Sequence, residues 1–164
     1  MIIVSDTSPI TSLLSIDQIE LLPQLYTTIF IPKGVEEELL KVQSRKSELE
    51  THLSKDWLEV RELTDQERFE EIFTQLDKGE SEAIALALEL NADLILIDES
   101  KGRKIARSYG LEVTGLLGVL IEAKSKKLVP SVKALLDELI SKAGFYLKRD
   151  LYLLVLEAVG EKSD

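Results

Sequence analysis

The feature of this sequence that most constrains its fold is a set of short apolar runs separated by segments of helical periodicity. The clearest runs are Ile2–Ser5 and Asp93–Ile97, which consist mainly of isoleucine, leucine and valine. Continuous apolar runs of this length are typical of strands buried on both faces, which occur mostly in parallel sheets covered by helices. The pattern therefore predicts an α/β protein, a three-layer α/β/α fold with a mainly parallel central sheet.

The other elements follow from periodicity and from turn residues. Strands are predicted over residues 26–31, stopped by Pro32, over 57–60 at an edge, and over 111–114. The first helix is predicted to have Ser8 as its N-cap and Pro9 at its first helical position. Further helices are predicted from Ile16 to near Pro23 and over 33–41, in a polar stretch through His52, and over 63–73, 80–90 (after a break at Gly79), 100–109 (closed by Gly110), 115–126, 131–142 and 149–159.

The chain length favours one domain. With 164 residues, the chain can bury a real core without disulfides or structural metals. We predict a single domain over residues 1–164, with residues 128–164 as a helical C-terminal extension packed on it. No apolar run reaches the 18 residues of a membrane span, and the first residues lack the basic start of a signal peptide. A cytoplasmic protein is the expectation.

The residue types present exclude several kinds of site. There is no cysteine, so disulfides, thiolate metal sites and cysteine nucleophiles are excluded. The only histidine, His52, excludes a histidine-rich metal site, so any bound metal must be held by oxygen atoms. The net charge of −10 repels nucleic acid on average. Contact with RNA or DNA therefore requires a local basic patch or bound cations.

Two predicted strands are followed by an aspartate at the same end. Asp6 follows Ile2–Ser5, and Asp98 follows the run that ends at Ile97. If the two strands are neighbours in a parallel sheet, the carboxylates meet at one edge, where a hard cation such as Mg²⁺ or Mn²⁺ would relieve their repulsion. The alternative is purely structural: Asp98 caps the helix that begins at Ser100, and Asp6 fixes the turn at Thr7 and Ser8.

Two predicted helices carry further acids in or near their first turns. Glu36, Glu37 and Glu38 follow the second strand, and Glu80 and Glu82 open the alanine-rich helix. A glutamate in a first turn commonly interacts only with the helix dipole, so these residues are weak evidence when taken alone.

Four short blocks of the sequence are distinctive in their order and spacing. The first block is VSDTSP at residues 4–9, and the second is IPKGVEEEL at residues 31–39. The third is LDKGESEAIALA at residues 76–87, and the fourth is LIDESKGR at residues 96–103, with VTGLLG following at 113–118. Together these blocks resemble the PIN domain family, and in particular an uncharacterised prokaryotic branch related to toxin nucleases. The resemblance covers nearly the whole chain and implies the PIN-like version of the fold predicted above.

The resemblance implies an acidic site made of four residues, which are Asp6, Glu38, Glu82 and Asp98. Glu82 is preferred as the third acid, Glu80 is its substitute, and Glu99 is a helper candidate. Glu37, and more weakly Glu36, are rivals of Glu38. Thr7 and Ser8 match the family's small hydroxyl residues, which orient a carboxylate or a water molecule, although Ser8 could equally serve only as a helix cap.

The activity implied by the resemblance is that of a divalent-metal-dependent ribonuclease, which hydrolyses phosphodiester bonds with water activated by Mg²⁺ or Mn²⁺. Its expected role is the toxin of a toxin–antitoxin pair, with RNA as substrate, a cognate antitoxin protein and a second copy of the chain as partners. The alternative is a PIN-like binding or regulatory module with little or no hydrolysis. A phosphohydrolase with Asp6 as nucleophile is disfavoured, because that chemistry uses Asp-x-Asp and position 8 is serine.

A basic cluster follows Asp98 and is the candidate contact for RNA phosphates. It consists of Lys101, Arg103, Lys104 and Arg107. The alternative is that these side chains are the solvated face of an amphipathic helix. The chain has one tryptophan and four each of tyrosine and phenylalanine, so a large base-stacking platform is not expected.

Overall fold

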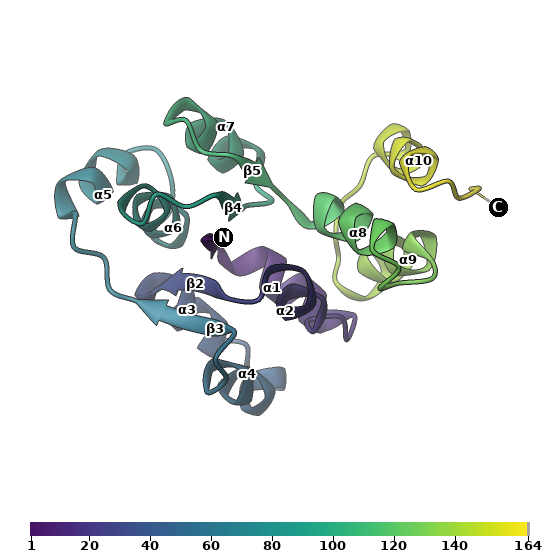
Figure 1. Cartoon of the computed structure of the whole chain (residues 1–164), viewed down its shortest axis with the longest axis horizontal. Helices are drawn as coiled ribbons and strands as arrows, with labels where there is room; N and C mark the ends of the chain where they lie inside the picture. The colour runs from purple at the N-terminus through teal and green to yellow at the C-terminus, as the bar shows by residue number, and fades with distance from the viewer. Residues whose placement is uncertain (164) are drawn as a thin grey trace.

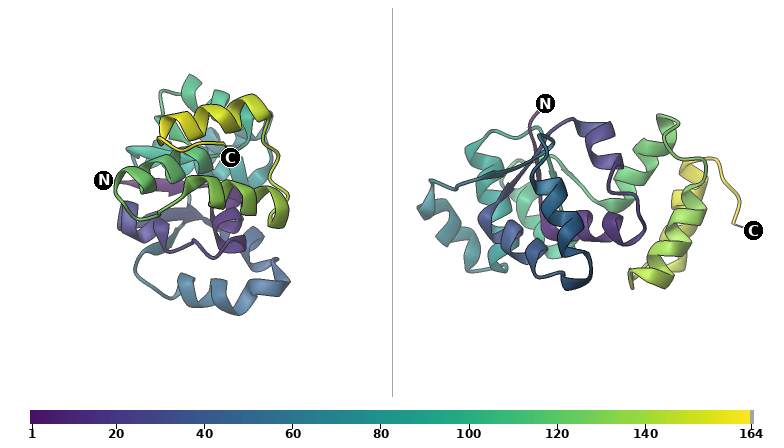
Figure 2. Two further views of the ribbon diagram at one scale, coloured as in Figure 1. Left: turned by 90° about the vertical axis from the view of Figure 1, so that its right-hand side faces the viewer. Right: turned by 90° about the horizontal axis from the view of Figure 1, so that it is seen from below.

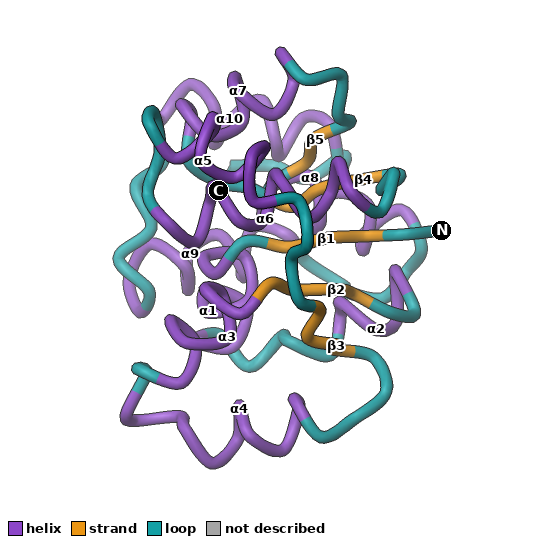
Figure 3. The backbone as a smooth tube through the Cα atoms, turned by 90° about the vertical axis from the view of Figure 1, so that its left-hand side faces the viewer, coloured by secondary structure: helices purple, strands orange, loops and turns teal. Residues whose placement is uncertain are grey.

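A five-stranded parallel sheet forms the centre of the molecule. The structure, a computed structural model, describes residues 1–163. The strand order is β3-β2-β1-β4-β5, and every neighbouring pair is parallel. The strands are β1 (Ile3–Ser5), β2 (Ile29–Pro32), β3 (Leu58–Arg61), β4 (Leu94–Leu96) and β5 (Val113–Thr114) (Figure 3).

Helices cover both faces of this sheet, which confirms the predicted three-layer α/β/α fold. Helix α6 packs across β1, β2 and β4, whereas α2 contacts β2 and α7 contacts β5. The helices, shown in Figure 1, are α1 (Thr7–Ser15), α2 (Leu21–Tyr26), α3 (Lys33–Leu40), the short 3₁₀ helix η1 (Gln43–Arg45), α4 (Lys46–Leu53), α5 (Gln66–Phe73), α6 (Lys78–Glu89), α7 (Ser100–Ser108), α8 (Leu116–Ser125), α9 (Val132–Lys142) and α10 (Arg149–Ala158).

The register of the central strands fixes the position of the two strand-end aspartates. Ser5 of β1 pairs with Leu96 of β4, and the Asp6 N–H donates to the Leu96 carbonyl at 2.9 Å. Strands β1 and β4 run in the same direction, so Asp6 and Asp98 emerge at the same edge of the sheet. Ile3 and Val4 are fully buried, as expected for the middle strand of a covered sheet.

Several predicted boundaries are wrong, and the errors near Pro9, Pro23 and Gly79 share a physical reason. Helix α1 begins at Thr7 with Asp6 in the N-cap position, so Ser8 is not the cap and Pro9 lies at the third helical position. Proline is tolerated there because the first four N–H groups of a helix lack intrahelical partners. Pro23 is likewise the third residue of α2, so the second strand begins at Ile29 rather than Tyr26 and includes Pro32.

Gly79 does not break the chain before α6. The helix begins at Lys78, one residue before Gly79, because Asp77 caps it by accepting a hydrogen bond from the Glu80 N–H at 2.9 Å. The edge position of β3, the closing of α7 before Gly110 (φ 85°) and the helices at the C-terminus are confirmed.

The last three helices form a group at one end of the molecule (Figure 2). Helix α8 contacts α1 and α2, and both α9 and α10 pack on α8. Whether residues 1–164 form one domain with 128–164 as an extension stays a prediction, and Asp164 lies outside the described residues. None of the helices described in residues 1–163 is long and apolar enough to cross a membrane.

Candidate active site

Asp6 is a buried carboxyl group at the centre of the candidate site. Its side chain is 5% exposed, and although it occupies the N-cap position of α1 it makes no capping hydrogen bond. Burial, together with the nearby acids Glu38, Asp77 and Asp98, raises the pKa of Asp6 to about 7, and a hydrogen bond with the Thr7 backbone opposes this rise. The Asp6 carboxyl group therefore lies both at the turn formed by Thr7 and among the other acids of the candidate site.

Asp98 lies at the end of the neighbouring strand and has one oxygen free. Its Oδ1 accepts a hydrogen bond from the Leu116 N–H at 2.6 Å, so it caps α8 rather than α7, which is capped by Glu99. Its Oδ2 is buried without a hydrogen-bond partner. Burial raises the pKa of Asp98, while the Leu116 N–H and Arg103 lower it.

Glu38 projects from α3 toward Asp6. The Thr7 hydroxyl donates a hydrogen bond to Glu38 Oε2 at 2.5 Å, which orients this carboxylate from the residue next to Asp6. The rival Glu37 is exposed and lies 3.6 Å from Lys78 Nζ as an ion pair, on a different side of the helix. Ser8 is exposed and makes no contact with these acids through a hydrogen bond.

Helices α3 and α6 meet through a reciprocal pair of glutamate–glycine contacts. The Glu38 carboxylate of α3 lies against Gly79 of α6, and the Glu82 carboxylate of α6 lies against Gly34 of α3. Each glycine is the second residue of its helix, and a Cβ atom at either position would collide with the glutamate. The absence of these two side chains therefore lets the carboxylates lie at the helix N-termini, where the dipole favours negative charge.

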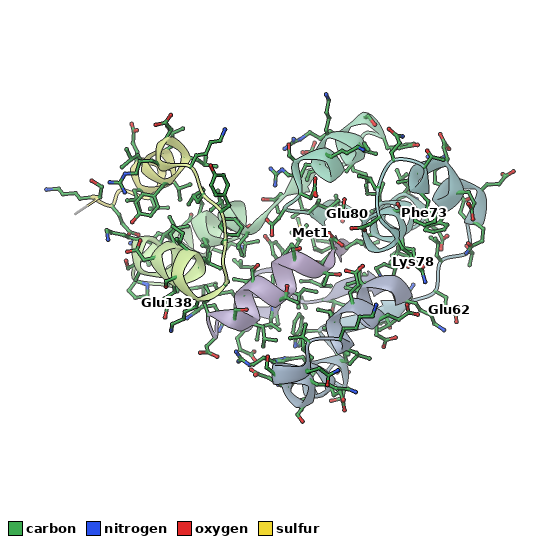
Figure 4. All side chains as sticks on the ribbon, turned by 180° about the vertical axis from the view of Figure 1, so that it is seen from behind. Met1, Glu62, Phe73, Lys78, Glu80 and Glu138 are labelled. Carbon is green, nitrogen blue, oxygen red and sulfur yellow. The ribbon has the colours of Figure 1, made fainter. Side chains whose placement is uncertain are left out.

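Glu80 is a second buried acid of α6, and it points toward α7. It is 8% exposed, and a Cβ atom on Gly102 would lie 2.8 Å from its Oε2. Burial raises the pKa of Glu80, and Asp77 and Asp6 raise it further. Figure 4 shows Glu80 in the interior, between α6 and α7.

The two candidates for the third acid thus face different neighbours. Asp6 is among the groups that act most strongly on Glu80, whereas the acids that act most strongly on Glu82 are Glu37 and Glu38. Asp77, which raises the pKa of both Asp6 and Glu80, was not among the predicted site residues. The spacing Asp77-x-x-Glu80 is a capping-box pattern, which was the signal available in the sequence.

The donor set fits a hard divalent cation, although no ligand set is complete. Three buried carboxylate oxygens lack hydrogen-bond partners: Glu80 Oε2, Glu82 Oε2 and Asp98 Oδ2. Carboxylate oxygens are the ligands that Mg²⁺ and Mn²⁺ prefer. Within residues 1–163, no three acidic or histidine side chains converge in metal-binding geometry. Completing a site would take side-chain movement, chiefly of the long glutamates.

The four basic side chains of α7 lie beside this edge. Lys101, Lys104 and Arg107 are exposed, and Arg103 is half-buried with its Nη1 donating to the Ile97 carbonyl at 3.0 Å. Among the described residues, none of the four forms an ion pair within 4 Å of an acid. In a chain with 30 acids, this helix therefore keeps positive charge available to a ligand.

Comparison with known proteins identifies a family for the chain as a whole. A family model described as a PIN domain matches residues 2–161, which is almost the whole chain. A search among curated proteins gave no match.

Proposed function

This chain belongs to the PIN domain family, and from that premise we propose that it is a divalent-metal-dependent ribonuclease and the toxin of a toxin–antitoxin pair. The family match supports a nuclease-like fold. The observation that carries the proposal is that Asp6 and Asp98 leave neighbouring parallel strands at the same edge of the sheet, with buried oxygens on Asp98 and on the nearby Glu80 that have no hydrogen-bond partner.

In this proposal, the position of each acidic residue determines its role in metal binding. Asp6 and Asp98 are the main metal ligands, because each is fixed at the end of a central strand. Glu38, oriented by Thr7, completes the group from α3. Glu80 is favoured as the acid that shares the ion with Asp6, and Glu82 holds its place against Gly34 beside Glu38.

Bound Mg²⁺ or Mn²⁺ would neutralise charge on the phosphate and lower the pKa of water, and this supplies the chemistry of phosphodiester hydrolysis. The acidic residues of the chain would hold and orient the ion. The basic residues Lys101, Arg103, Lys104 and Arg107 would contact the RNA backbone. An antitoxin protein, a homodimer and a cytoplasmic location are parts of the proposal that rest on the family resemblance.

The alternative is a PIN-like binding or regulatory module with weak or no hydrolysis. The observation that favours it is that no three acidic or histidine side chains within residues 1–163 converge in metal-binding geometry.

Cleavage of mixed RNA with Mn²⁺ or Mg²⁺ separates the two functions. The wild-type protein should cut RNA, and Asp6→Asn and Asp98→Asn should each lose at least about 100-fold of that activity. Equal cleavage by all three proteins would mean that the activity comes from another site or a contaminant. RNA binding without metal-dependent cleavage would favour the binding module.

A further inference from the structure

A groove of about 480 Å³ begins at Asp98 and extends toward the C-terminal helices. Its polar end is lined by Asp98, Ser100 and Arg103. Its apolar part is formed by α8, by the segment before α10 and by α10 itself, with lining residues that include Leu117, Ile121, Phe145, Tyr146, Leu151 and Val155. Figure 4 shows α7 and α10 apart from each other, with the segment that leads into α8 between them. The proposed hydrolytic site uses only the Asp98 end.

The apolar part carries a tyrosine that is almost fully open to solvent. Tyr146 is 82% exposed although it lines the groove, and Leu151 beside it in the lining is 43% exposed. Exposed aromatic rings next to aliphatic side chains provide flat surfaces on which nucleobases stack. The shape and chemistry of this wall therefore suit a planar, partly apolar ligand.

The charge around the groove points to the same ligand. Arg103 lies in the wall, and Lys101 and Lys104 lie on the same helix. Lys148 and Arg149 follow Tyr146 in the chain, and both are exposed, although neither lines the groove. Among the described residues none of these five forms an ion pair, although the net charge of the chain is −10. A basic side chain at one end of an apolar groove complements the phosphate and the base of a nucleotide better than it complements an apolar peptide.

We propose that this groove is a nucleoside-binding subsite, in which one base of single-stranded RNA stacks on Tyr146 and its phosphate lies toward Arg103. The inference rests on the proposed ribonuclease function, because it takes Asp98 as the place where the scissile phosphate lies. The base in the groove belongs to the nucleotide next to that phosphate. The groove then selects single-stranded RNA, since a paired base cannot enter it.

The test measures binding of a labelled single-stranded RNA of about eight nucleotides by fluorescence anisotropy in EDTA, so that no cleavage occurs. Tyr146→Ala should raise the Kd roughly 5- to 150-fold, the range given by loss of one stacking contact, and Tyr146→Phe should preserve the affinity. Leu151→Ala should weaken binding to a smaller extent. Leu154→Ala is the matched control, because Leu154 is 60% exposed on the same helix but does not line the groove.

Oligonucleotides with a single abasic position make the test specific to a base. One abasic position should raise the Kd for the wild type. For Tyr146→Ala, the abasic and the intact oligonucleotide should have the same Kd. Independent, additive effects, an unchanged Kd for Tyr146→Ala, or no measurable RNA binding would each overturn the proposal. A sedimentation change from dimer to monomer in Tyr146→Ala, without base-dependent binding, would assign the groove to a second copy and overturn it as well.

The outcome for the groove is separable from the outcome for hydrolysis. Metal-dependent cleavage together with unchanged RNA binding by Tyr146→Ala would support the ribonuclease function and contradict the nucleoside-binding subsite. Base-dependent binding that needs Tyr146, without cleavage in Mn²⁺ or Mg²⁺, would support the nucleoside-binding subsite and contradict the hydrolytic function. Thermal melts of each variant confirm that a loss of binding does not come from unfolding.

Discussion

The carboxylate of Glu38 lies directly against Gly79, in space that any larger residue at position 79 would fill. The contact joins α3 to the second residue of α6, and the Thr7 hydroxyl holds the other side of the same carboxylate at 2.5 Å. The position of Glu38 is therefore set by three separate parts of the chain, although the site it faces is formed by the ends of β1 and β4.

Gly79→Ala is expected to damage the site without damaging the fold. Alanine in place of a helical glycine favours the helix by up to about 1 kcal/mol, but its Cβ atom displaces the Glu38 carboxylate. Thermal stability should hold or rise, while Mn²⁺ affinity, measured by calorimetry, should fall about 10-fold or more. In a Glu38→Gln background the same change should have little further effect. An additive loss in that background would contradict the contact as its cause.

Asp6→Asn is expected to stabilise the metal-free protein above neutral pH. The folded pKa of Asp6, about 7, is higher than its ordinary value of 3.8, so the folded state binds more protons than the unfolded state between these values. The contribution of Asp6 to the stability of the wild type is therefore complete below about pH 4, and it is lost as pH rises through about 7. Thermal melts from pH 5 to pH 8 in EDTA should show Asp6→Asn losing less stability than the wild type. In the same melts, added Mn²⁺ should raise the melting temperature of the wild type but not that of Asp6→Asn.

Glu80→Gln and Glu82→Gln distinguish the two candidates for the third acid. Glu80 shares the electrostatic environment of Asp6, so Glu80→Gln should reduce Mn²⁺-dependent cleavage about 100-fold, and Glu82→Gln nearer to 10-fold. Glu37→Gln is the control, because Glu37 is exposed and pairs with Lys78. The reverse order of the two effects would identify Glu82 as the ligand, as the family resemblance implied.

Removing two basic side chains of α7 should change the salt dependence of RNA binding. Lys101→Ala with Lys104→Ala removes two exposed charges that have no acidic partner within 4 Å. If both contact phosphates, the slope of log K against log salt should become shallower by about 1.4, which is two phosphates of single-stranded nucleic acid. The pair Lys41→Ala and Lys46→Ala, also exposed, should leave the slope unchanged. Equal slopes for both pairs would show that α7 is only a solvated face.

Glu161→Gln should loosen the C-terminal helices. Glu161 accepts hydrogen bonds from the Val132 N–H at 2.7 Å, the Lys133 N–H at 3.0 Å and the Ser131 hydroxyl at 3.1 Å, and pairs with Lys124 at 3.1 Å. These contacts lower its pKa to about 2, so its contribution is full above about pH 4.5 and is lost as pH falls toward 2.

Urea unfolding should therefore show Glu161→Gln less stable by about 1–2 kcal/mol at pH 7 and by less at pH 3.5. The control is Glu157→Gln, an exposed position on α10, which should change stability little at either pH. A loss that is equal at the two pH values would mean that the charge of Glu161 is not what holds the helices together.

The sequence by itself determined the architecture of this protein. The apolar runs ending at Asp6 and Asp98 identified two central strands and the edge at which they end, because a buried parallel strand needs continuous apolar residues. The blocks around these residues also carried the family resemblance that the match over residues 2–161 bears out. Boundaries at Ser8, Pro23 and Gly79 were wrong because proline and glycine fit the first turn of a helix as well as they end one.

Only the tertiary structure decided how the acids are arranged around that edge. Glu80 and Glu82 are two residues apart on one helix, so their side chains point in different directions, and the sequence alone does not say which one faces Asp6. The answer depends on where α6 lies against β1 and α3, which is set by contacts between distant segments, such as those of Glu38 with Gly79 and of Glu82 with Gly34. Burial then sets the pKa of each carboxyl group, and burial is a property of the packed chain that no short motif contains.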